Sequence, residues 1–96
     1  MSNSLIIFSL NGCSHCKTLK NKLTEISIPY MDIEITKNES IWNEVVNQTG
    51  YNILPTVYIR KDDGDEGPVF VPGRDFKNDD EIIEIIKRYI KISEED

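Results

Sequence analysis

Short apolar runs and segments of helical periodicity alternate along the first half of this chain. Residues 5–10 are mostly Leu, Ile and Phe, and Asn11-Gly12 ends the run, which predicts a short buried strand. Apolar residues then recur at helical spacing over residues 14–27, which predicts an amphipathic helix. Pro29 excludes helix beyond that segment, and alternating apolar and polar residues over 30–35 predict a half-buried strand.

A second helix is predicted after this strand. Asn38 or Ser40 can cap its start, and Gly50 is suited to the position that follows its last turn. The residues expected to face inward are Ile41, Trp42, Val45, Val46 and Thr49.

The end of the chain predicts a hairpin and a last helix. Residues 56–60 and 69–71 have strand character, and the charged loop 61–67 between them is long enough to let them pair antiparallel. Asn78 is the expected cap of the last helix, with acidic residues in its first turn. The residues expected to be buried on this helix are Ile82, Ile83, Ile86, Tyr89 and Ile90.

These elements follow one another as βαβαββα. We expect one domain over residues 1–96, with residues 92–96 forming a frayed acidic tail. Two β-α-β crossovers are expected to make the early strands parallel, with helices on the faces, and the last two strands to form an antiparallel hairpin. The predicted fold class is therefore α/β, built on a mixed four-stranded sheet. Ligands of such sheets gather at the carboxyl edge of the strands, where residues 11–16 lie.

Both cysteines of the chain lie in this turn, two residues apart, as Cys13-Ser14-His15-Cys16. A strand, a turn with C-x-x-C and a helix together indicate a redox site. At the first turn of a helix, a sulfur faces unpaired backbone N–H groups and the positive end of the helix dipole, which favour the reactive thiolate. We therefore take Cys13 as the nucleophile and Cys16 as the resolving thiol, one turn on, where it can close a disulfide.

Other interpretations of this turn remain open. His15 is either an exposed residue without a role or a group that further stabilises the Cys13 thiolate and makes the protein more oxidising. Ser14 lies beside it and is a second candidate modulating residue. A zinc site is disfavoured, because two thiols and a badly placed His15 leave it short of four ligands.

Composition limits the partners. The chain has 96 residues and a net charge of −6, which argues against nucleic-acid binding because phosphate contacts need a basic face. No apolar run is long enough to span a bilayer, and residues 1–4 have no secretory pattern. Two cysteines without an export signal predict a reducing, cytoplasmic compartment. We also expect a monomer.

At three places the chain resembles the glutaredoxin family. The first is Cys13-Ser14-His15-Cys16, which follows a single strand. The second is residues 49–55, T-G-Y-N-I-L-P, which are similar to the family's T-G-x-x-T-V-P segment. The third is residues 71–75, V-P-G-R-D, which are similar to the family's I-G-G-x-D turn. The resemblance covers nearly the whole length and implies a thioredoxin-like three-layer α/β/α sandwich.

The resemblance also implies a glutathione site. Pro55 stands where the family has a cis proline, which would expose the backbone of Leu54 to the cysteinyl part of glutathione. Gly73 would allow close approach of the ligand. Arg74 and Asp75 are expected near the start of the last helix, where N–H groups can hold a carboxylate and Asp75 an ammonium group.

Several positions depart from the family pattern. Leu10 replaces a usual Lys, Asn52 a frequently basic residue, Ile53 a Thr and Pro72 a Gly. Two cations for glutathione carboxylates are therefore missing. Lys17, Lys20 and Arg74 are the candidates to replace them.

The resemblance implies a dithiol glutaredoxin that reduces protein disulfides and glutathione mixed disulfides. Ribonucleotide reductase is one protein substrate that this analogy suggests. Two alternatives stay open: a dimer that holds a [2Fe–2S] cluster through the first cysteine and glutathione, and a thioredoxin-like donor reduced by a reductase. The cluster is not favoured, because the C-G-F-S pattern of dedicated carriers is absent. The Ile-, Asn- and Lys-rich usage suggests an AT-rich genome such as that of a virus or phage, in which case the compartment would be a host cytoplasm.

Overall fold

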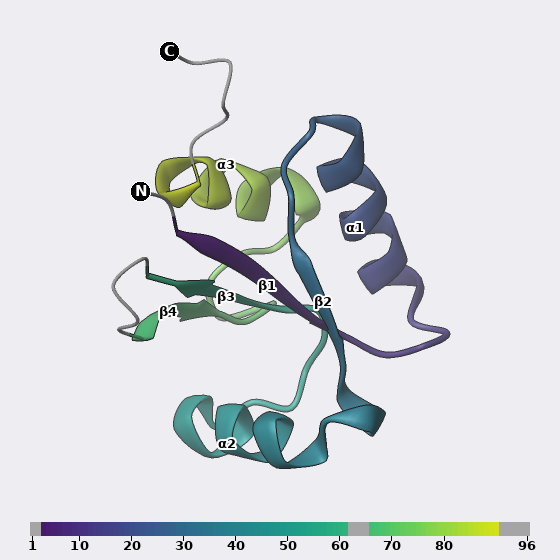
Figure 1. Cartoon of the computed structure of the whole chain (residues 1–96), viewed down its shortest axis with the longest axis vertical. Coiled ribbons are helices and arrows are strands. Elements are labelled where there is room, and N and C mark those ends of the chain that lie inside the picture. Colours follow the sequence, from purple (N-terminus) through teal and green to yellow (C-terminus); the bar gives the residue numbers. More distant parts are fainter. Residues whose placement is uncertain (1–2, 62–65, 91–96) are drawn as a thin grey trace.

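Figure 1 shows the computed structural model, which describes residues 3–61 and 66–90. The elements in chain order are β1 (Ser4–Ser9), α1 (Ser14–Glu25), β2 (Met31–Glu34), the 3₁₀ helix η1 (Ile35–Lys37), α2 (Glu39–Thr49), β3 (Thr56–Arg60), β4 (Glu66–Phe70) and α3 (Asp79–Tyr89). None of the helices in the described residues is long and apolar enough to span a membrane.

The strands form the predicted mixed four-stranded sheet, in which their order is β2-β1-β3-β4. β1 and β2 are parallel, and β3 and β4 form the expected antiparallel hairpin. One expectation is wrong: β3 runs antiparallel to β1, so the second crossover does not produce a parallel strand. β2 ends at Glu34, which pairs with Ser9, and β3 begins at Thr56, which pairs with Phe8. Because β3 therefore begins at the same edge of the sheet at which β1 and β2 end, it runs antiparallel to both.

Helices cover both faces of the sheet, which confirms the three-layer α/β/α sandwich (Figure 1). β1 lies at the centre and is buried on both sides. Leu5 and Ile7 pack with residues of α1 and α3, whereas Ile6 and Phe8 face α2. The ring centroids of Phe8 and Trp42 lie 5.6 Å apart. The continuous apolar run of β1 is thus explained by burial on two faces.

The helix termini show which predicted caps form. Asn78 caps α3, since its Oδ1 accepts a hydrogen bond from Glu81 N at 2.9 Å. Gly50 ends α2 with a φ of 78°, a left-handed conformation that favours glycine. Asn38 precedes α2, but its side chain donates to Glu34 O at 3.0 Å instead of capping the helix.

Other boundaries differ from the predictions by a few residues. α1 ends at Glu25, and Ser27 turns the chain with a φ of 63°. Residues 35–37 form a 3₁₀ turn that the periodicity did not indicate. Ile41 is 47% exposed, because the apolar face of α2 that packs against the sheet is centred on Trp42, and Ile41 lies at the edge of that face. β4 starts earlier than expected, at Glu66. Residues 62–65 of the loop and the acidic tail 92–96 lie outside the described residues.

Candidate active site

A tight turn at the carboxyl edge of the sheet places the first cysteine at the start of α1. Cys13 N donates to Leu10 O at 3.0 Å, which closes the turn. Gly12 inside it has a φ of 91°, a conformation that side chains other than glycine rarely adopt. The Asn11-Gly12 pair therefore does more than end the strand, because it directs Cys13 into the N-cap position of α1.

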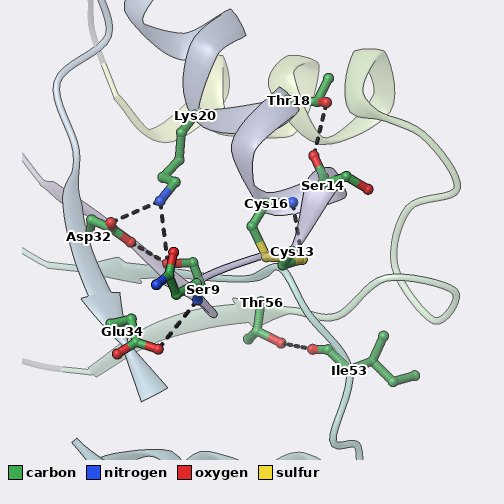
Figure 2. The surroundings of a disulfide bond; sticks show 11 residues. Ser9, Cys13, Ser14, Cys16, Thr18, Lys20, Asp32, Glu34, Ile53 and Thr56 are labelled. Atoms are coloured by element: carbon green, nitrogen blue, oxygen red, sulfur yellow. Dashed lines mark hydrogen bonds and ion pairs between the residues drawn. A yellow bond between two sulfur atoms is a disulfide. The ribbon is translucent and has the colours of Figure 1, made fainter. Parts of the chain in front are cut away.

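Cys13 and Cys16 form a disulfide with a Cα–Cα separation of 5.3 Å (Figure 2). Cys13 Sγ also accepts a hydrogen bond from Cys16 N at 3.3 Å. After reduction, the same N–H group and the amino end of α1 face the Cys13 sulfur and favour its thiolate. Cys13 is half-buried, whereas Cys16 is only 1% exposed. An incoming disulfide can therefore reach Cys13 and not Cys16, in keeping with the predicted roles.

The two residues between the cysteines face solvent. Ser14 and His15 are both exposed on the first turn of α1. The carbonyl of Ser14 accepts a hydrogen bond from Thr18 Oγ1 at 2.9 Å, a contact that stays within the helix. In the described part of the chain His15 forms no hydrogen bond with Cys13, and its modulating role stays a prediction.

The second predicted site segment also lies at this edge of the sheet. The Leu54–Pro55 peptide bond is cis, as the resemblance implies. Pro55 is buried directly before β3, and Leu54 packs in the core beneath α2. Thr56 Oγ1 donates to Ile53 O at 2.7 Å (Figure 2).

The third segment forms a turn just before α3. Gly73, Arg74 and Asp75 precede Asn78, the N-cap residue of α3, by a few positions, so they lie near the helix start as expected. Their own N–H groups donate to Phe76 O and Val71 O within the turn. The glutathione contacts expected of these three residues stay predictions.

Arg74 and Asp75 are each other's partners. Asp75 Oδ2 accepts from Val71 N at 2.7 Å and from Arg74 Nε at 2.8 Å. Burial opposes ionisation of Asp75, but the hydrogen bonds from Arg74 and Val71 and the Arg74 charge hold the pKa of Asp75 below its usual range. The Arg74 guanidinium also donates to Val69 O at 2.9 Å and lies 5.6 Å from the centroid of the Tyr51 ring. The turn is thereby joined to the segment before Pro55.

A polar groove on the other side of Cys13 is a feature that the sequence analysis missed. We call it the α1–β2 groove. It is lined by Ser9, Leu10, Asn11, Gly12, Cys13, Ser14, Lys17, Lys20, Asp32, Glu34 and Lys37, and its volume is about 700 Å³. In Figure 2, Lys20, Asp32 and Glu34 lie on the opposite side of the disulfide from Ile53. The sequence did contain an indication of this groove. Asp32 and Glu34 lie at the end of a strand predicted to be parallel to β1, so their side chains were to be expected beside the end of β1.

Ser9, Lys20 and Asp32 form a network in this groove. Ser9 is 1% exposed, and its Oγ donates to Asp32 Oδ1 at 2.5 Å. Lys20 Nζ lies 2.9 Å from Asp32 Oδ2 and 3.5 Å from Ser9 Oγ. Burial opposes ionisation of Asp32, yet the hydrogen bonds from Ser9 and Lys20 and the Lys20 charge lower its pKa. The network ties α1 to the ends of β1 and β2.

This network predicts a pH-dependent contribution to stability. Because the pKa of Asp32 is lower in the folded chain than the ordinary value of about 4, its carboxylate stabilises the fold above that pH, and this contribution disappears as the pH falls through the folded-state pKa. Asp32→Asn should lower the free energy of unfolding by up to about 1 kcal/mol at pH 7, as expected for a partly exposed pair. Urea unfolding at pH 7 and pH 3 measures it, with Lys20→Gln as a second variant. An equal loss at both pH values would contradict the prediction.

Metal ligands are not gathered in the described residues. Within 3–61 and 66–90, no three His, Cys, Asp or Glu side chains are close enough together to hold an ion. A cluster bound through Cys13 would have to take its remaining ligands from outside this part of the chain.

Comparison with known proteins places this site in a family. The glutaredoxin family model matches residues 5–63. The N-acetyl-S-hydroxy-L-cysteine reductase of Bacillus subtilis is 29% identical over 56 residues, covering 58% of this chain and 60% of that protein. Glutaredoxin-2 of Schizosaccharomyces pombe is 32% identical over 62 residues, covering 62% of this chain and 56% of that protein. The chain thus matches only 56–60% of the length of these relatives.

Solved structures share the fold. The oxidised thioredoxin of Plasmodium falciparum superposes with a TM-score of 0.66 at 17% identity, covering 93% of this chain and 82% of that chain. A buckwheat glutaredoxin–glutathione complex superposes with a TM-score of 0.57 at 21% identity, covering 90% of this chain and 70% of that chain. At these identities the likeness shows the fold alone.

The chain has the thioredoxin fold, with a Cys13–Cys16 disulfide at the start of α1. Since the family model covers more than half of its residues, the chain belongs to the glutaredoxin family.

Proposed function

We propose that this chain is a glutathione-dependent thiol–disulfide oxidoreductase that reduces protein disulfides and glutathione mixed disulfides. The observation that carries the proposal is the accessible Cys13 at the amino end of α1, joined to the buried Cys16. This arrangement activates one sulfur and keeps the second within reach but away from solvent.

The reaction runs as two thiol–disulfide exchanges. The Cys13 thiolate attacks one sulfur of the substrate disulfide, forms a mixed disulfide and releases the other sulfur as a thiolate. Cys16 then attacks Cys13 Sγ, which releases the second substrate thiol and leaves the Cys13–Cys16 disulfide. Two glutathione thiols reduce that disulfide and become glutathione disulfide. Where Cys13 carries glutathione, a second glutathione resolves it directly.

Glutathione as the reductant is supported by the family and by the segments that surround Cys13. The similar buckwheat structure is a glutaredoxin–glutathione complex by its own description. Leu54 and Pro55 supply the cis-proline segment at the same edge of the sheet, and Gly73 and Asp75 supply the turn. Leu10 and Asn52 are neutral at positions where the family has basic residues for the glutathione carboxylates. This difference favours a second candidate function, a thioredoxin-like electron donor that is reduced by a reductase.

We also propose that the protein acts as a monomer on disulfide-bearing proteins, with ribonucleotide reductase as one candidate. The place of action would be a reducing cytoplasm, that of a host cell if the gene is viral. The position of both cysteines in one C-x-x-C turn supports a reducing compartment, because a catalytic thiol pair has to be reduced again after each reaction and glutathione does so in such a compartment.

One assay separates the two candidate functions. The protein reduces a small glutathione mixed disulfide while glutathione and glutathione reductase regenerate it, and a parallel reaction contains thioredoxin reductase instead. Turnover with glutathione is the expected result. Turnover only with thioredoxin reductase would overturn glutathione dependence and support the donor function.

A further inference from the structure

The segment that leads into the cis Leu54–Pro55 bond has few contacts of its own backbone. Residues 51–53 are exposed, whereas Leu54 packs beneath α2 and Pro55 is buried. Among the described residues, the N–H groups of Ile53 and Leu54 donate no hydrogen bond, so an extended ligand can accept from them. Such a segment binds a ligand more tightly when it already has the bound conformation, because ordering it during binding costs free energy.

Two side-chain contacts hold this segment. Asn52 Oδ1 accepts a hydrogen bond from Trp42 Nε1 at 3.1 Å, and Trp42 is only 6% exposed, so this contact is anchored in the core beneath the sheet. The guanidinium carbon of Arg74 lies 5.6 Å from the centroid of the Tyr51 ring, which is within the range of cation–π attraction. The first contact joins the segment to α2, and the second joins it to the turn before α3.

The Arg74 guanidinium is itself fixed in place. It donates to Val69 O at 2.9 Å and to Asp75 Oδ2 at 2.8 Å. Asp75 Oδ2 in turn accepts from Val71 N at 2.7 Å, so the cation is attached to the end of β4 and to the turn that follows it. Tyr51 therefore packs against a cation that cannot easily move, and the contact restrains Tyr51 as well.

We propose that Tyr51 is a positioning residue, held by Arg74, that keeps the segment before Pro55 in the conformation to which the substrate binds. Asn52 has the same role and is held by Trp42. The inference rests on the proposed disulfide exchange and adds which side chains prepare the chain for a peptide or glutathione backbone. Neither positioning residue takes part in the sulfur chemistry, so its loss should slow exchange with a bound substrate and leave the reactivity of the nucleophilic thiolate unchanged.

Two rates, measured without a co-reductant, test this role. In the first reaction, the reduced protein meets an excess of a glutathionylated peptide, and an acid quench with mass spectrometry measures the loss of the protein dithiol. Cys13 attacks the glutathione sulfur and releases the peptide thiol, and Cys16 then attacks Cys13 Sγ, releases glutathione and leaves the Cys13–Cys16 disulfide, so the reaction balances. In the second reaction, iodoacetamide alkylates Cys13 and releases iodide, which requires the thiolate but no bound backbone.

The Tyr51–Arg74 contact has matched variants. Tyr51→Leu should slow exchange with the glutathionylated peptide about two- to fivefold, the range for an exposed cation–π contact, whereas Tyr51→Phe keeps the ring and should retain the wild-type rate. Arg74→Met should slow exchange as much as Tyr51→Leu does, and the double variant should be no slower than either single variant. The alkylation rate should stay the same in all of them. Lys77→Gln, at another exposed cation, is the control.

The Asn52–Trp42 contact has a spectroscopic readout. Trp42 is the only tryptophan of the chain, so its indole N–H gives a single NMR signal. Asn52→Leu removes the acceptor, should shift that signal and should slow exchange about two- to tenfold, as expected for one hydrogen bond. S-methylglutathione, a thioether that cannot exchange, should move the signal in the wild-type protein and not in Asn52→Leu. Asn47→Leu, the same substitution at an exposed position of α2, is the control.

The outcomes separate the inference from the function. A slow Arg74→Met variant beside a Tyr51→Leu variant of wild-type rate would overturn the role of Tyr51, because that result indicates that Arg74 contacts the ligand itself. An Asn52→Leu variant of wild-type rate would overturn the role of Asn52. Equal slowing of exchange and alkylation would overturn both roles, since it indicates a general effect on Cys13. Failure of the wild-type protein to react with the glutathionylated peptide would instead overturn the proposed function.

Discussion

Replacing Cys13 by Ser is expected to remove disulfide exchange, with a loss of at least about a thousandfold in rate. Cys13 is the accessible sulfur of the pair and the N-cap residue of α1, so its thiolate alone combines access with stabilisation by N–H groups. A serine hydroxyl in the same place ionises far less readily than a thiol and forms no mixed disulfide. The measurement is the glutathione-coupled reduction of a small mixed disulfide.

The fold should survive this substitution. A serine oxygen is a preferred N-cap acceptor and can take over the hydrogen bond from Cys16 N. The circular dichroism spectrum and unfolding midpoint of Cys13→Ser are therefore expected to match those of the reduced wild-type protein. Residual turnover above the uncatalysed rate in a folded variant would show that the nucleophile is misassigned.

Replacing Cys16 by Ser is expected to divide the two activities. Cys16 is 1% exposed and lies against Cys13 Sγ, so it acts on a mixed disulfide already formed at Cys13 and does not meet the substrate first. A glutathione mixed disulfide can still be resolved by a second glutathione, so that this activity should persist. A protein mixed disulfide loses its intramolecular resolving thiol, and direct reduction of a protein disulfide should fall by at least about a hundredfold.

Two substrates assayed side by side check this division. Reduction of a glutathionylated peptide should remain measurable in Cys16→Ser, while reduction of the insulin disulfides should be lost. Trapped mixed disulfide between Cys13 and insulin, visible on a non-reducing gel, is the expected by-product. Loss of both activities in a folded variant would contradict the separate roles of the two cysteines.

Local chemistry made much of this structure predictable. The apolar run of β1, the Asn11-Gly12 turn and the C-x-x-C spacing are short-range features, and short-range sterics and hydrogen bonding decide them. Asn78 and Gly50 marked helix ends because a cap needs only the neighbouring backbone. The periodicity of α3 predicted its buried isoleucines, since one helix face must meet the sheet.

Contacts between distant segments were beyond the sequence. The antiparallel direction of β3 depends on where α2 returns the chain, which no local pattern encodes. The Arg74 guanidinium lies 5.6 Å from the centroid of the Tyr51 ring, a contact between segments far apart in the sequence that no local pattern indicates. The periodicity of α2 predicts Ile41 to be buried, but the orientation of α2 on the sheet leaves its side chain 47% exposed.

The sequence by itself therefore determined the order of elements, the redox turn and the position of Cys13 at a helix start, because each depends on residues a few positions apart. Only the tertiary structure decided which lysines near Cys13 have carboxylate partners. Ser9, Lys20 and Asp32 come from three different elements, and they meet only when α1 packs beside the parallel ends of β1 and β2. The arrangement of charge in the α1–β2 groove is the result of that packing.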